Sequence, residues 1–161
     1  MQVFLEPRGI ALTGHVLHEE RLWHHVGSEG NSMLALSPMR IPGCDILTGR
    51  PETLVESDRL LTPKYASSVA HLHGRREVMS EVSDWEERNR GDWATIEERY
   101  GCLALQCMLG VTTFTSYFQW KEFEKDDTRR LLDAVARICS AVRRGTHEAG
   151  IGVLYPIRSV W

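Results

Sequence analysis

The sequence predicts an α/β fold built around a parallel sheet. Short runs of β-prone residues alternate along the chain with segments of helical periodicity, which is the pattern of βα units. Glycine, proline and aspartate stand between the runs as turn and cap residues. The chain has 161 residues, 42% hydrophobic residues and a formal charge of -3, the composition of an ordinary globular protein.

The first βα unit is predicted near the N-terminus. Residues 10–13 form a short apolar run that we expect to be a strand. Residues 19–26 have helical character, and Gly27 and Gly30 end that segment. Residues 33–36 are expected to add a helical turn.

The second and third units follow in the middle of the chain. Residues 43–47 are the second strand candidate, and the polar stretch 48–58 is expected to be a loop. Thr62 is predicted to cap the next helix, because a threonine hydroxyl can accept a bond from a free amide at the helix start. Pro63 suits the first helical position, and Gly74 is predicted to end the helix.

The third strand leads into a long helix. We expect residues 76–81 to form that strand, followed by a loop through Trp85 and Arg90. Asp92 is predicted to cap a helix that Gly110 ends. That helix is indicated by hydrophobic residues at helical spacing: Trp93, Ile96, Tyr100, Leu103 and Cys107. The β-branched run 111–115 is the fourth strand candidate.

The last long helix has the clearest signals. Asp126 or Asp127 is predicted to cap it, and Gly145 to stop it. Its apolar face consists of Leu131, Val135, Ile138 and Val142. Beyond it, the apolar residues 151–156 predict a further strand.

One pattern resembles a known family. The helix over residues 64–71 reads Lys-x-x-Ser-Ser-x-Ala-His, and the strand after it ends in Glu81. This order resembles bacterial glycoside hydrolases with a (β/α)8 catalytic barrel, in the α-L-rhamnosidase-like and β-galactosidase-like families. Residues 13–20, 41–45 and 153–157 resemble further segments in the family's order, so the resemblance covers nearly the whole chain.

The resemblance implies that the four predicted strands are the fifth to eighth of a barrel. A complete (β/α)8 barrel needs about 250 residues, whereas this chain has 161. We therefore expect residues 1–145 to be the C-terminal half of the barrel, and residues 146–161 to be a linker and the first strand of a following α/β domain. The expected partners are the missing N-terminal half and a carbohydrate substrate.

Glu81 is the predicted catalytic carboxylate. In parallel barrels the active site is built from the carboxyl ends of the strands, and glycoside hydrolysis needs two carboxyl groups. Glu81 would be the nucleophile of a retaining enzyme or the general base of an inverting one; the alternative is a surface glutamate that ends a strand. By the resemblance the proton donor lies upstream, so the isolated chain is expected to be inactive. Glu19 and Glu20 are interpreted as acids in the first turn of a helix.

Five further residues are predicted to bind the sugar. His15 follows the first strand and could bond a hydroxyl or orient a carboxylate, although a buried structural histidine is an equal alternative. Asp45 lies at the end of the second strand. Trp85, Tyr117 and Trp120 could stack on the apolar face of a sugar ring, or else pack against neighbouring segments.

Other functional classes have weaker support in the sequence. No metal or cofactor is expected: a His-Glu-x-x-His site beginning at His18 would need a second histidine where Leu22 stands. A metal-dependent hydrolase that uses the histidines between His15 and His25 remains an alternative, as does a non-catalytic carbohydrate-binding or interaction domain.

Charge and hydrophobicity also restrict the partners. Neither nucleic acid nor a membrane is expected, given the balanced charge and the lack of a stretch of about 20 apolar residues. No signal peptide is visible. The four cysteines Cys44, Cys102, Cys107 and Cys139 show neither metal-site nor disulfide-framework spacing and are expected to be buried free thiols.

Overall fold

A computed structural model, which describes residues 2–161, contains a curled four-stranded parallel sheet. The strands are adjacent in the order β1-β2-β3-β4, and each pair of neighbours is parallel. Their bounds are β1 Thr13–Gly14, β2 Ile41–Ile46, β3 Met79–Val82 and β4 Thr113–Ser116. The prediction of an α/β fold with a parallel sheet is confirmed, and all four strands lie within three residues of their predicted starts.

Most helices lie in the connections between these strands, and the others lie before β1 and after β4. The α-helices are α1 Gln2–Leu5, α2 Leu22–Ser28, α3 Ser32–Leu36, α4 Pro51–Glu56, α5 Thr62–Leu72, α6 Trp85–Arg90, α7 Ile96–Met108 and α8 Lys125–Arg144. Short 3-10 turns are η1 Glu6–Arg8, η2 Asp58–Leu61, η3 Trp120–Glu122 and η4 Ile157–Ser159. No helix within residues 2–161 is long and apolar enough to cross a bilayer.

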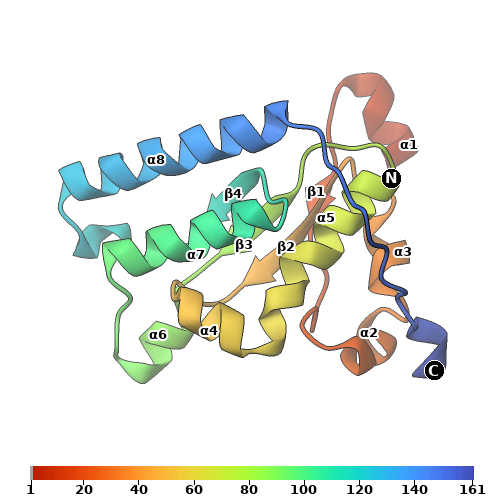
Figure 1. The fold of residues 1–161 in the computed structure, drawn as a ribbon, viewed down its shortest axis with the longest axis horizontal. Helices are drawn as coiled ribbons and strands as arrows, with labels where there is room; N and C mark the ends of the chain where they lie inside the picture. Colours follow the sequence, from red (N-terminus) through yellow and green to blue (C-terminus); the bar gives the residue numbers. More distant parts are fainter. Residues whose placement is uncertain (1) are drawn as a thin grey trace.

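Helices α4, α5, α7 and α8 lie on one face of the sheet (Figure 1). The core forms between this face and the helices, and its residues are apolar. It contains Cys44, Ile46 and Val82 from the strands together with Ala66, Ala70, Cys102, Leu103, Leu131 and Val135 from the helices. Val135 and Leu131 of α8 are buried as the predicted apolar face requires.

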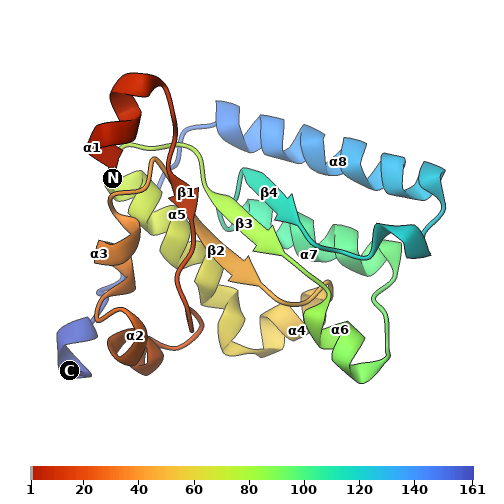
Figure 2. The same ribbon diagram turned by 180° about the vertical axis from the view of Figure 1, so that it is seen from behind.

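The opposite face of the sheet is uncovered within the described chain. Figure 2 shows this face with the strands toward the viewer and none of the described helices lying across it. Side chains alternate between the two faces of a strand, and Cys44 and Val82 belong to the helix-covered core. Asp45 and its register partner Glu81 therefore point to the uncovered side.

Three helix starts differ from the sequence expectation. Helix α8 begins at Lys125 with Glu124 before it, so Asp126 and Asp127 lie in its first turn and neither is its cap. Helix α7 begins at Ile96 rather than after Asp92, because Thr95 caps it. The Thr95 hydroxyl accepts a bond from the Glu98 amide at 3.1 Å, and the Glu98 carboxylate accepts one from the Thr95 amide at 2.6 Å. Thr62 is itself the first residue of α5 rather than its cap. Pro63 occupies the first turn and the helix ends just before Gly74, as predicted.

Two segments predicted to be loops are helical. Residues 48–58 contain α4, which starts at Pro51 and buries Leu54 completely. The segment after β3 forms α6, whose residues Glu86 and Glu87 are buried despite their charge. Both helices have only six residues, so helical periodicity gave little signal. Helix α6 is mostly polar and is held by buried bonds, in which the Glu87 carboxylate accepts from the Thr48 hydroxyl and the Gly49 amide.

The strand predicted at residues 151–156 is wrong. These residues form no strand, and Ile151, Val153 and Leu154 are 85%, 91% and 83% exposed. A β-prone run needs a neighbouring strand to supply its hydrogen bonds, and none lies beside it in the described structure. The tail instead returns to α2, where the Trp161 indole donates to the Gly30 carbonyl at 2.9 Å and Ile157 is buried.

Gly43 allows a close approach between the first three strands. A Cβ atom at this position would meet the Gly14 carbonyl oxygen at 2.6 Å and the Met79 Cε atom at 2.7 Å. Any larger residue at position 43 would therefore push β2 away from the β1 backbone and displace the Met79 side chain. The site described next is built on this tight packing.

Candidate functional site

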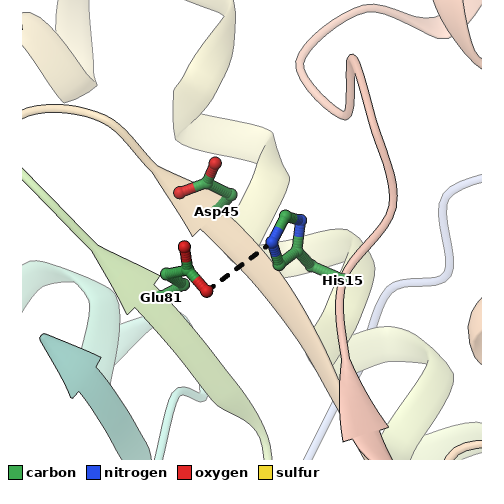
Figure 3. Close-up of side chains that lie close together, drawn as sticks. All are labelled: His15, Asp45 and Glu81. Carbon is green, nitrogen blue, oxygen red and sulfur yellow. Dashed lines mark ion pairs between the residues drawn. The ribbon is translucent and has the colours of Figure 1, made fainter. Parts of the chain in front are cut away.

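The carboxyl ends of β1, β2 and β3 bring three polar side chains together (Figure 3). His15 follows β1 directly, and Asp45 and Glu81 are opposite one another in β2 and β3. One ligand-type atom from each side chain lies within 4.8 Å of the others. His15 Nε2 is 3.7 Å from Glu81 Oε2. All three were predicted from the sequence as separate site residues, and the structure places them in one cluster.

Glu19 links this cluster to the backbone beneath it. The residue is only 7% exposed. It accepts a bond from the Val16 amide at 2.7 Å and one from the Asp45 amide at 2.8 Å. Its Oε1 atom also lies 3.4 Å from His15 Nδ1. Glu19 therefore connects the end of β1 to the end of β2 and orients the imidazole.

The predicted role of Glu19 in a helix start is wrong. Helix α2 begins at Leu22, and Arg21 is the residue before it. His18 adopts a left-handed backbone conformation, with φ 54, that turns the chain between His15 and Glu19. A carboxylate four residues after a strand-end histidine was the only sequence signal for this contact.

Burial and charge shift the titration of the cluster. The hydrogen bond that the His15 ring donates to the Glu19 carboxylate raises the pKa of His15 to about 9, although burial opposes the shift. Burial is the main cause that raises the pKa of Asp45 to about 6. Burial also raises the pKa of Glu19, whereas its bonds to His15, Asp45 and Val16 lower it. At neutral pH the site therefore holds an imidazolium beside Glu81.

The predicted aromatic residues occupy different environments. Trp85 opens α6 after β3, and Tyr117 follows β4; they are 53% and 58% exposed. The Tyr117 amide donates to the Val82 carbonyl at 2.8 Å, which keeps it at the carboxyl end of the sheet. Trp120 packs edge-to-face on Phe118 at a centroid distance of 5.4 Å and lies against the core.

A buried ion pair holds the loops that follow β3 and β4. Asp84 Oδ2 accepts from the Gln119 amide at 2.8 Å and from Arg99 NH2 at 3.3 Å. Asp84 and Arg99 are both fully buried. The Arg99 guanidinium also faces the Phe118 and Phe123 rings at 4.7 and 4.3 Å. These contacts fix the segments that carry Trp85 and Tyr117, and the sequence alone did not reveal them.

The histidines between His15 and His25 do not form a metal site. His25 is buried and bonds the Tyr155 hydroxyl at 2.7 Å and the Glu19 carbonyl at 2.8 Å. The His18 and His24 rings contact each other edge-on at 5.6 Å. Within residues 2–161, the one group whose atoms are spaced to hold a metal is His15, Asp45 and Glu81. An imidazole with two carboxylates suits a divalent cation.

Comparisons of the chain with protein-family models, with curated proteins and with solved structures found no match.

Proposed function

We propose that this chain is the C-terminal half of a glycoside hydrolase barrel that cleaves a terminal glycosidic bond of a plant or bacterial polysaccharide, with Glu81 as one of two catalytic carboxyl groups. The observation that supports it most is the cluster of His15, Asp45 and Glu81 at the carboxyl ends of three consecutive parallel strands. In (β/α)8 enzymes this edge of the sheet carries the active site.

The sheet geometry is compatible with half of such a barrel. Its four strands follow chain order, β1 and β4 form its two edges, and one face is uncovered in the described chain. A complementary half would pair with both edges and fill that face, which would give the eight strands and packed interior of a complete barrel. The N-terminal half expected from the family resemblance is the partner we propose.

Each side chain of the cluster has a role in this proposal. Glu81 attacks the anomeric carbon or activates water, and the complementary half supplies the proton donor. The protonated His15 imidazole lies 3.7 Å from Glu81 and orients its carboxylate. Asp45, on the adjacent strand, bonds a sugar hydroxyl, while Trp85 and Tyr117 offer exposed rings at the same edge.

The test is Glu81→Gln in the chain assembled with its upstream half, assayed on a panel of aryl glycosides. We expect turnover to fall by several orders of magnitude while folding and sugar binding persist. Glu77→Gln is the matched control, because Glu77 precedes β3 at the opposite end of the strand. Near-normal turnover in Glu81→Gln would rule out its catalytic role. Sugar binding without any turnover in the assembled wild type would identify a carbohydrate-binding domain instead.

A metal-dependent hydrolase is the second candidate, since the same three side chains are spaced to hold a cation. In that reaction a bound metal would activate water. Titration calorimetry with Zn²⁺, Mn²⁺ and Ca²⁺ tests it, with Asp45→Asn as the variant expected to lose binding. Activity that survives chelation, together with no measurable heat of binding, would exclude this candidate.

A further inference from the structure

A pair of cysteines lies where α7 packs against α8, outside the candidate site. Cys107 Sγ and Cys139 Sγ are 3.7 Å apart, although the residues are 32 positions apart in the chain. Both are free thiols. The expectation of buried free thiols holds for Cys44, Cys102 and Cys107, whereas Cys139 is only partly buried.

We propose that Cys107 and Cys139 form a thiol–disulfide site, which small disulfides such as oxidised glutathione convert into a covalent link between α7 and α8. Cys139 is the attacking thiolate and Cys107 is the resolving thiol.

The surroundings of Cys139 favour this role. Its side chain is partly exposed and lines a surface cavity of about 470 Å³ together with Thr113 and Arg143. The hydrogen bond from Cys107 lowers the pKa of Cys139 to about 7; burial opposes this shift, and the positive charge of Arg143 adds to it. Thiolate near a cation in an accessible position is the reactive form of cysteine.

Cys107 is suited to act second. It is only 2% exposed, and its contact with Cys139 and its burial raise its pKa, so it remains a thiol at neutral pH. The other two cysteines lack such a partner thiol. Cys44 and Cys102 are 1% and 0% exposed, and burial raises the pKa of both, that of Cys102 to about 12. They are therefore expected to be inert.

The reaction consists of two exchange steps. The Cys139 thiolate attacks one sulfur of the oxidant, whose S–S bond breaks and releases a thiolate. The Cys107 sulfur then attacks Cys139 Sγ in the mixed disulfide, passes its proton to the solution, and releases the second oxidant sulfur, which leaves as a thiol. The cysteine pair loses two electrons and the oxidant gains them. The two sulfurs must approach from 3.7 Å to about 2.0 Å.

The link would fix the helix that covers the β4 edge. Of the α8 residues, only Leu131 and Val135 are buried. Arg143 also holds this helix to the strand region, through the Thr112 carbonyl at 2.9 Å and the Thr113 hydroxyl at 2.5 Å. A covalent bond at Cys139 would add a third attachment. Oxidation should therefore stabilise the fold.

The experiment places the full chain in buffers with increasing ratios of oxidised to reduced glutathione, followed by acid quenching and intact-mass analysis. We expect a loss of about 2 Da, a Cys107–Cys139 peptide in the digest, and a melting temperature roughly 5–10 °C higher. Cys107→Ala should trap glutathione on Cys139. Cys139→Ser should form neither product. Cys102→Ser, on the same helix, is the matched control and should retain the link.

Alkylation of the unsubstituted chain gives a second measurement that does not depend on how the variants fold. Iodoacetamide should modify Cys139 at least ten times faster than Cys102 at neutral pH, as expected from the accessible thiolate. The proposal is overturned if the cysteines are alkylated at equal rates. It is also overturned if the digest shows links scattered among all four residues, or if Cys139→Ser still loses about 2 Da.

Discussion

Replacing Arg99 by methionine tests the buried ion pair beneath the loops after β3 and β4. The substitution introduces an apolar side chain of similar length. It removes the fully buried guanidinium that lies 3.3 Å from Asp84 Oδ2 and leaves the buried Asp84 carboxylate with the partly exposed Arg88 and the Gln119 amide. Removing one member of a buried pair typically costs about 3–5 kcal/mol of unfolding free energy. Because small domains are stable by only about 5–15 kcal/mol, this single change should remove a large share of the stability.

Arg88 provides a control at the same acceptor. Arg88 NH2 lies 3.2 Å from Asp84 Oδ1, but its side chain is 47% exposed, whereas Arg99 is completely buried. Water reaches the Arg88 end of its pair with Asp84 and screens it, so Arg88→Met should cost less than about 1 kcal/mol. Urea unfolding followed by tryptophan fluorescence measures both. With a typical slope, the midpoint for Arg99→Met should fall by roughly 2 M.

A double variant separates the charge from the packing. Adding Asp84→Asn to Arg99→Met removes the buried carboxylate charge that Arg99 no longer balances, so the double variant should be more stable than the sum of the single changes by about 2–3 kcal/mol. Arg99 also contacts the Phe118 and Phe123 rings, and the packing lost there should remain. Equal costs for Arg99→Met and Arg88→Met, or strict additivity with Asp84→Asn, would refute the reasoning.

Three further outcomes are expected. Glu19→Gln should lower the pKa of His15 from about 9 towards the ordinary value of 6.5, measured by NMR titration of the imidazole with Glu20→Gln as control; an unchanged titration would contradict the positioning role. Because folding raises the His15 pKa, its contribution to stability is full below about pH 6.5 and should be lost as the pH rises through about 9, which urea unfolding at several pH values would show. In the assembled enzyme, Tyr117→Ala should raise KM more than it lowers kcat, whereas Trp120→Ala, whose ring lies against the core, should mainly lower the melting temperature; the reverse pattern would exchange their roles.

Elements with local signals were predictable from the sequence. The β-branched content of β4, the proline at the start of α5 and the apolar face of α8 each act within a few neighbouring residues. The cluster of His15, Asp45 and Glu81 was predictable from the sequence for a related reason. Parallel strands end at one edge of a sheet, so residues chosen separately as strand ends converge once the strands pair in chain order.

Features that depend on distant partners were not predictable. Glu19 bonds the amide of Asp45, 26 residues away, and Asp84 bonds Arg99 and Gln119 from two other segments. No periodicity in the sequence marks such contacts. The strand predicted for residues 151–156 was wrong although its local signal was present. The composition matches a strand pattern, but a strand also requires the free edge of a sheet beside it.

The arrangement of His15, Asp45 and Glu81 depends on glycine at position 43. A methyl group there would collide with the Gly14 carbonyl oxygen and the Met79 side chain, and His15 is the next residue after Gly14. The variants in a library with random substitutions at position 43 would therefore fall into two classes. Substitutions that merely preserve the hydrophobic core could still yield a folded chain, but those that displace β1 would carry the imidazole away from Glu81. Variants at position 43 that fold but lose activity would thus show that the spacing of His15, Asp45 and Glu81 is required, separately from any requirement for folding.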